Sequence, residues 1–237
     1  MLLIARREFT SIFRSPQGFI IAALYLGLVG LYFNLQVLKG EKYSADVLKD
    51  FFQALSGFTM FFSIFISMGL IAKERESHTF PLLLTSPVKD FQIVLGKFLG
   101  AYLFLILLTL ATIYMPLLVM VNGKVSWGHV FSGYLGITML GGACLGIGTF
   151  GSSLTRSQIV AIFVSLGIGV PMVLFWLLGK HVDKPLSDIF GYMAIHNIHF
   201  SSFKSGKIHL RDIVFYFSIM SFFLFAATRM LESRRWR

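Results

Sequence analysis

Six runs of about twenty predominantly apolar residues constrain the fold of this chain more than any other feature. The first five runs contain no Asp, Glu, Lys or Arg, and the sixth carries only Asp212 and Arg229 near its ends. Because a charged side chain at the centre of a bilayer costs about 3 kcal/mol or more, charge-free runs are typical of membrane-spanning segments. The predicted spans are residues 18–38, 51–72, 98–121, 130–154, 159–178 and 212–231.

Composition leads to the same fold class. Of the 237 residues, 56% are hydrophobic and only 14% are charged, whereas a soluble domain carries about 25% charged residues. Spanning segments must be helical, because an open strand leaves backbone groups unpaired in lipid. We therefore predict an all-α integral membrane protein, with six transmembrane helices in a single domain over residues 1–237. The lone Cys144 lies inside an apolar run, which excludes a disulfide framework within the chain.

The distribution of positive charge predicts the orientation of the chain. An even number of spans places both termini on one side of the membrane. More than half of the 21 Lys and Arg residues fall on the side that holds residues 1–17, 73–97 and 155–158 and the C-terminal tail. Positive residues concentrate on the cytoplasmic side, so we expect both termini there. The net charge of +10 is carried by residues that flank spans and does not indicate nucleic-acid binding.

Residues 2–15 are predicted to form an amphipathic helix that Pro16 ends. Such a helix lies in the headgroup plane before the chain enters the bilayer, and the alternative is a generic positively charged flank. The residues expected on its apolar face are Leu2, Ala5, Phe9, Ile12 and Phe13. Those expected on its polar face are Arg6, Arg7, Thr10 and Arg14.

The 73–97 loop begins with four charged residues and continues with a short apolar stretch, Leu82 to Leu84. Pro81 is suited to the first turn of a helix, and Pro87 stops it. We expect a short cytoplasmic helix with an exposed apolar face. That face either binds a partner or folds back onto the membrane domain of this chain.

Two further segments have features that bear on packing. The outer loop, residues 179–211, contains an apolar stretch that is too short to span, and it is predicted to be re-entrant or interfacial around Phe190, Tyr192 and Met193. The fourth span carries Gly142 and Gly146 at the spacing that lets another helix approach closely. The approaching helix belongs either to this chain or to a partner.

Motifs for chemistry are lacking in the sequence. There is no phosphate loop of the form G-x-x-x-x-G-K-[ST], no G-x-S-x-G and no H-E-x-x-H. Four histidines lie on the outer loop, but no Cys and no acidic residue at ligand spacing accompanies them, so we expect structural histidines and no metal site. These histidines are His181, His196, His199 and His209. We therefore expect that the chain is not an enzyme by itself and binds no cofactor.

The stretch from residue 72 to residue 100 resembles the coupling segment of ABC-2 type permeases. The family pattern is similar to E-[KR]-x-x-G-T-x-E-x-L-L-[TS]-x-P-[VI]-x-x-x-x-[IV]-x-x-[GA]-K, and His78 and Pro81 depart from it. The matching residues are Glu74, Thr79, Leu83, Leu84, Thr85, Pro87, Val88, Ile93, Gly96 and Lys97. Residues 6–9 and 13–16 also resemble the start of that family. The C-terminal segments 199–212 and 231–236 are most similar to the gliding-motility GldF and nitrous-oxide-cluster NosY branch.

The resemblance implies the fold of a type V exporter: six helices, an N-terminal elbow helix, a cytoplasmic coupling helix and a re-entrant outer segment. It implies a bacterial inner-membrane complex of two permease subunits, identical or different, with two ATP-binding subunits that hold ATP and Mg. It also implies the residues that contact the ATPase: Glu74, Arg75, Thr79, Leu82, Leu83, Leu84, Thr85 and Pro87.

Two other readings compete with an ATP-driven permease. One is a membrane anchor that passes ATP-driven force to periplasmic partners without moving a solute. The other is a membrane-embedded enzyme, which the lack of a polar constellation at membrane depth disfavours.

Overall fold

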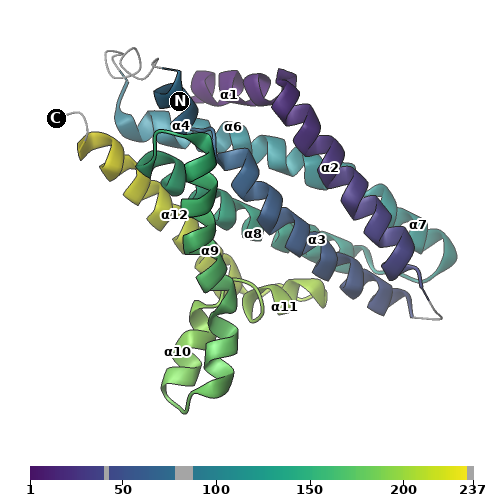
Figure 1. Ribbon diagram of the computed structural model, residues 1–237. Coiled ribbons are helices and arrows are strands. Elements are labelled where there is room, and N and C mark those ends of the chain that lie inside the picture. The colour runs from purple at the N-terminus through teal and green to yellow at the C-terminus, as the bar shows by residue number, and fades with distance from the viewer. Residues whose placement is uncertain (40–42, 78–87, 234–237) are drawn as a thin grey trace.

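The computed structural model describes residues 1–39, 43–77 and 88–233, and its regular elements in these ranges are all helical (Figure 1). Three short helices accompany the long ones: α1 (Leu2–Arg14), α10 (Leu186–Met193) and α11 (His199–Lys204). The long helical stretches are α2 (Pro16–Tyr32) with the π-helix η1 (Phe33–Val37), α3 (Ser44–Ser67) with α4 (Ala72–Glu76), α6 (Asp90–Ala111) with α7 (Tyr114–Asn122), α8 (Trp127–Leu154), α9 (Gln158–His181) and α12 (Leu210–Ser233).

The predicted fold class is confirmed, because six of these stretches are long and apolar enough to cross a membrane. The helices extend beyond the apolar runs. α3 begins at Ser44 and α6 begins at Asp90, both several residues before the apolar stretch that identified the span. Hydropathy marks the part of a helix that suits lipid, whereas the backbone hydrogen bonds continue into polar sequence until a cap or turn ends them.

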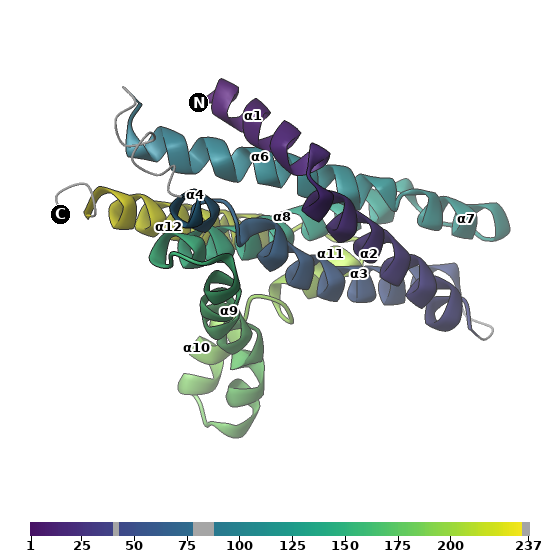
Figure 2. The same cartoon turned by 45° about the horizontal axis from the view of Figure 1, so that its top comes forward.

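α8 is the central helix, packed against α3, α6, α9, α11 and α12, and it is the most buried of the six (Figures 1 and 2). Gly142 and Gly146 face α12 of the same chain. A Cβ added at Gly142 would lie 2.8 Å from Sδ of Met220, and one added at Gly146 would lie 3.5 Å from Cα of Met220. The two helices therefore pack with their backbones close together, as small residues allow in membranes.

Replacing Gly146 with Leu is expected to push α12 away from α8. The extra atoms of Leu would meet the α12 backbone, which cannot rotate away as a side chain can, and overpacking of this kind costs about 1–3 kcal/mol. Thermal unfolding of the detergent-purified protein measures the loss. Gly27→Leu is the matched control, because nothing lies within 4 Å of a Cβ added there. Equal melting temperatures for the two variants would contradict this packing.

α9 and α10 project away from the other helices (Figures 1 and 2). α9 is the least buried of the six long helices, and its exposed apolar side chains include Ile159, Phe163 and Leu174. α10 folds back along α9, with the rings of Phe190 and Phe175 5.9 Å apart. This hairpin leaves a long apolar face for lipid or for another subunit.

The part of the outer loop that enters the helix bundle follows α10 in sequence, and α10 itself lies outside the bundle. Tyr192 and Met193 on α10 are 51% and 44% exposed, whereas the side chains of Ile195, Phe200 and Phe203 are buried. The backbone N–H of Ile195 donates to the carbonyl oxygen of Met172 in α9. The part of this loop that packs into the core is therefore residues 194–203.

Candidate coupling site

α1 and α2 meet at an elbow that the local sequence dictates. Ser15 is extended, with ψ at 145°, and its hydroxyl oxygen accepts a hydrogen bond from the N–H of Gly18 at 2.9 Å. Pro16 occupies the first position of α2, where a missing N–H costs little. The chain therefore turns sharply at Ser15, and α1 lies against the first half of α6 (Figure 1).

The contact between α1 and α6 depends on a close approach at Gly100. A Cβ added there would lie 2.6 Å from the carbonyl oxygen of Ala5. Of the apolar face predicted for α1, Ala5 is buried, and Phe9 and Ile12 pack against the core. Leu2 and Phe13 do not share this contact, since they are 77% and 44% exposed. Arg6, Arg7 and Arg14, which were predicted to lie on the polar face, are exposed.

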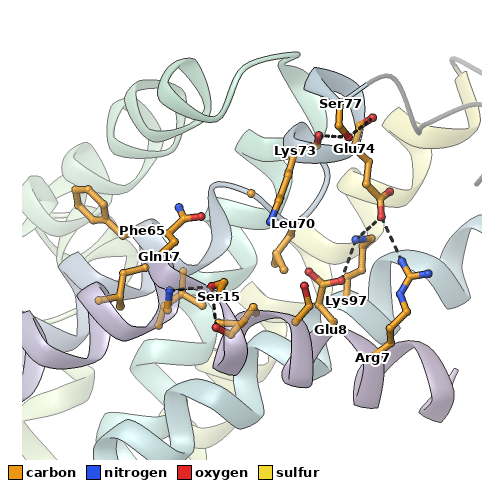
Figure 3. Close-up of a pocket in the computed structure, with 16 residues that line it drawn as sticks. Arg7, Glu8, Ser15, Gln17, Phe65, Leu70, Lys73, Glu74, Ser77 and Lys97 are labelled. Atoms are coloured by element: carbon orange, nitrogen blue, oxygen red, sulfur yellow. Dashed lines mark hydrogen bonds and ion pairs between the residues drawn. The ribbon is translucent and has the colours of Figure 1, made fainter.

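A buried ion-pair cluster joins α1, α4 and α6 (Figure 3). Nζ of Lys97 lies 2.8 Å from Oε1 of Glu74 and 3.0 Å from Oε2 of Glu8. Arg7 adds a longer contact of 3.6 Å to the same oxygen of Glu74. The Lys97 side chain is only 4% exposed, so its charge needs both carboxylates to remain in this position.

Arg75 ties α4 to the end of α8. Its Nη1 donates to the carbonyl oxygens of Ser153 at 2.6 Å and Thr155 at 3.1 Å. The hydroxyl oxygen of Ser152 accepts from the backbone N–H groups of Ile71 and Ala72, at the start of α4. These bonds satisfy N–H groups that the first turn of a helix leaves without intrahelical partners.

Three of the four consecutive charged residues of α4 thus contact different parts of the bundle. Glu74 reaches α1 and α6, Arg75 reaches α8, and the carboxylate of Glu76 accepts from Nε2 of Gln158 in α9 at 2.9 Å. α4 is therefore fixed to four helices, α1, α6, α8 and α9. α4 stands directly before residues 78–87.

Six of the residues expected to contact an ATPase lie outside the described residues: Thr79, Leu82, Leu83, Leu84, Thr85 and Pro87. The other two, Glu74 and Arg75, make the contacts within the membrane domain given above. Sequence reasoning did not identify Lys97 as the partner of Glu74, or the carbonyl groups of Ser153 and Thr155 as the partners of Arg75. No signal in the sequence indicated these contacts, because a Lys that flanks a span, such as Lys97, ordinarily extends its ammonium group to the interface and needs no counter-ion.

The outer loop and the start of α12 form a second polar cluster. Nδ1 of His199 lies 2.8 Å from Oδ1 of Asp212, and its Nε2 lies 3.1 Å from the carbonyl oxygen of Tyr192. Nε2 of His196 lies 2.7 Å from the hydroxyl of Ser56, and burial lowers the pKa of His196. Within residues 1–39, 43–77 and 88–233, no three His, Cys, Asp or Glu side chains are arranged to hold a metal ion.

Comparison with known families adds one finding. A sequence model described as "ABC-2 family transporter protein" matches residues 2–235, which include all three parts of the site: α1, α4 and the start of α6. No curated protein matches the chain.

Proposed function

The chain belongs to the ABC-2 family of transporter proteins, and from this membership we propose that it couples ATP hydrolysis in a separate ATP-binding subunit to movement of a substrate across the membrane. The family supports a multi-pass membrane permease and implies an ATP-binding cassette partner. ATP and Mg would bind in that partner, and this chain would supply the path and the moving helices.

The observation that carries the proposal is the attachment of α4. Glu74, Arg75 and Glu76 connect the start of the 78–87 segment to α1, α6, α8 and α9. In the proposed mechanism, Leu82, Leu83 and Leu84 occupy a groove of the ATP-binding subunit, as an apolar helix face does in a partner. Closure of that subunit on ATP would push the segment, and α4 would transmit the motion to the bundle.

A bacterial inner-membrane location with both termini in the cytoplasm fits this mechanism. α1, α4 and the end of α12 lie at the same end of the molecule (Figure 1), which would face the ATP-binding subunit. The exposed apolar face of α9 supports pairing with a second permease subunit, identical or different. The terminal motifs favour the GldF and NosY branch, hence a gliding-motility or related export system.

The second candidate is a membrane anchor that transmits ATP-driven force to periplasmic partners without solute transport. The projecting α10 favours it, because Ile189 and Tyr192 are 52% and 51% exposed there. Both candidates require the same ATP-binding subunit. Transport assays on reconstituted complex, with and without ATP, distinguish them.

Purification of the tagged full chain from its native membrane in mild detergent tests the shared step. We expect an ATP-binding subunit to co-purify with the tagged chain, and the purified complex to hydrolyse ATP. A variant of that subunit without its phosphate-loop lysine should still co-purify, but the complex should not hydrolyse ATP. An intact six-helix protein that carries no ATP-binding subunit would contradict the proposal.

A further inference from the structure

A cleft of about 370 Å³ opens between α1, the start of α2 and the junction of α3 with α4 (Figure 3). Its two parts differ in chemistry. Polar side chains from α1, α4 and the residue that follows α4 include Ser11, Lys73 and Ser77, and Gln17 adds an amide from the first turn of α2. Apolar side chains line the side between α2 and α3, where they include Ile21, Phe65, Ile66 and Leu70. An occupant must therefore be polar at one end and apolar at the other.

The polar part of the cleft has an excess of positive charge. The buried Lys97 and the exposed Arg7 beside it are balanced by Glu8 and Glu74. Lys73 extends from α4 toward α1 (Figure 3), and its ammonium group makes no ion pair within residues 1–39, 43–77 and 88–233. The positive charge of the Lys73 ammonium group therefore favours an anionic occupant of the cleft.

Positive charge continues outside the cleft along α1. A shallow groove next to it is lined by Arg6, Arg7, Thr10, Ser11 and Arg14, so Ser11 borders both surfaces. The aromatic side chains of Phe13 and Phe19 nearby are 44% and 61% exposed, as suits a helix at a membrane surface. The polar end of the cleft thus lies beside an interfacial helix, and its apolar end leads between two spans.

We propose that this cleft binds one anionic glycerophospholipid. Its phosphate would lie at Lys73, with Ser11 and Gln17 as hydrogen-bond donors, and an acyl chain would follow Ile21, Phe65 and Ile66. A peptide segment of a partner suits the site less well, because the apolar walls belong to membrane-spanning helices. Bound in this way, the lipid bridges α1 and α4, which are the elements that carry the coupling site. The inference requires the membrane-spanning helices but not the ATP-binding subunit.

Native mass spectrometry of the detergent-purified full chain tests the site. The probes are phosphatidylglycerol and phosphatidylcholine with identical acyl chains. We expect one phosphatidylglycerol to bind about fivefold more tightly than phosphatidylcholine, and Lys73→Gln to remove that preference. Ser11→Trp should weaken both lipids by filling the cleft without changing its charge. Lys124→Gln is the matched control and should keep the preference. It removes an exposed charge two residues after α7, and α7 lies far from α1 and α4 (Figure 1).

Two results would overturn the proposal. One is equal binding of the two lipids by the unaltered chain. The other is an unchanged preference for phosphatidylglycerol in Lys73→Gln. If that variant also loses the ATP-binding subunit, the Lys73 ammonium group contacts the subunit and not a lipid. Lys73 is exposed, so Lys73→Gln should fold normally. If Ser11→Trp does not fold, the lipid preference of Lys73→Gln is sufficient to test the proposal. Lipid selectivity is measured without ATP, so its failure is separate from failure of the proposed function.

Discussion

Replacing Lys97 with Met is expected to destabilise the protein by about 3 kcal/mol and to loosen α1 from α6, because two carboxylates would lose their buried counter-ion. Glu8 and Glu74 lie 3.0 Å and 2.8 Å from Nζ of Lys97, whereas Arg7 reaches only Glu74, at 3.6 Å. The effect should appear as a lower melting temperature and as faster proteolysis within residues 2–14. Stimulation of the partner's ATP hydrolysis should fall as well, because α4 loses its contact with α6.

Two further variants separate loss of charge pairing from loss of packing. Lys97→Arg keeps a cation between the carboxylates and should retain most of the stability. Lys97→Met combined with Glu8→Gln and Glu74→Gln should recover part of the loss, because no ionised group is then buried without a partner. A Lys97→Met variant as stable as the unaltered chain would show that the cluster does not hold α1 in place.

Replacing Leu83 with Asp is expected to weaken association with the ATP-binding subunit about thirtyfold, the effect of losing a single interface hot spot. The substitution places a charge where the proposed mechanism requires an apolar contact, and such a charge is costly to desolvate. The amount of ATP-binding subunit retained on the tagged chain, at matched protein concentration, measures the loss.

The control for this variant is Leu83→Met, which keeps an apolar side chain of similar volume and should retain the partner. The Asp variant should still insert and fold, because position 83 lies outside all six predicted spans. Its melting temperature therefore serves as the internal check. A normally folded Leu83→Asp chain that retains its full amount of ATP-binding subunit would remove the coupling role from this segment.

The six-helix fold could be predicted because its signal is local. Each span is a continuous apolar run, and the bilayer imposes helices on such runs without reference to distant residues. Gly142 and Gly146 likewise indicated a close helix neighbour by their spacing. That the neighbour is Met220 of α12 could not be predicted, because a small-residue pair indicates close packing but does not identify its partner.

The contacts of the candidate coupling site could not be predicted from local sequence patterns. Lys97 and Glu8 are 89 residues apart in sequence, and Arg75 is separated from Ser153 by 78. No periodicity links residues at such distances, so α4 could be predicted to be charged but not to be attached on three sides. The outer loop is similar. Its predicted apolar stretch, residues 189–195, centred on Phe190, Tyr192 and Met193, and only its last two residues, Ala194 and Ile195, are buried, with Ile195 bonded to α9.

Site-specific photo-crosslinking in native membranes tests the coupling role most directly. A photoreactive residue at position 83 should give an adduct with the ATP-binding subunit, and one at position 124, at the opposite end of the bundle, should give none. An adduct from position 124, or none from position 83 while the subunit co-purifies, would place the ATPase elsewhere on the chain and contradict coupling through α4.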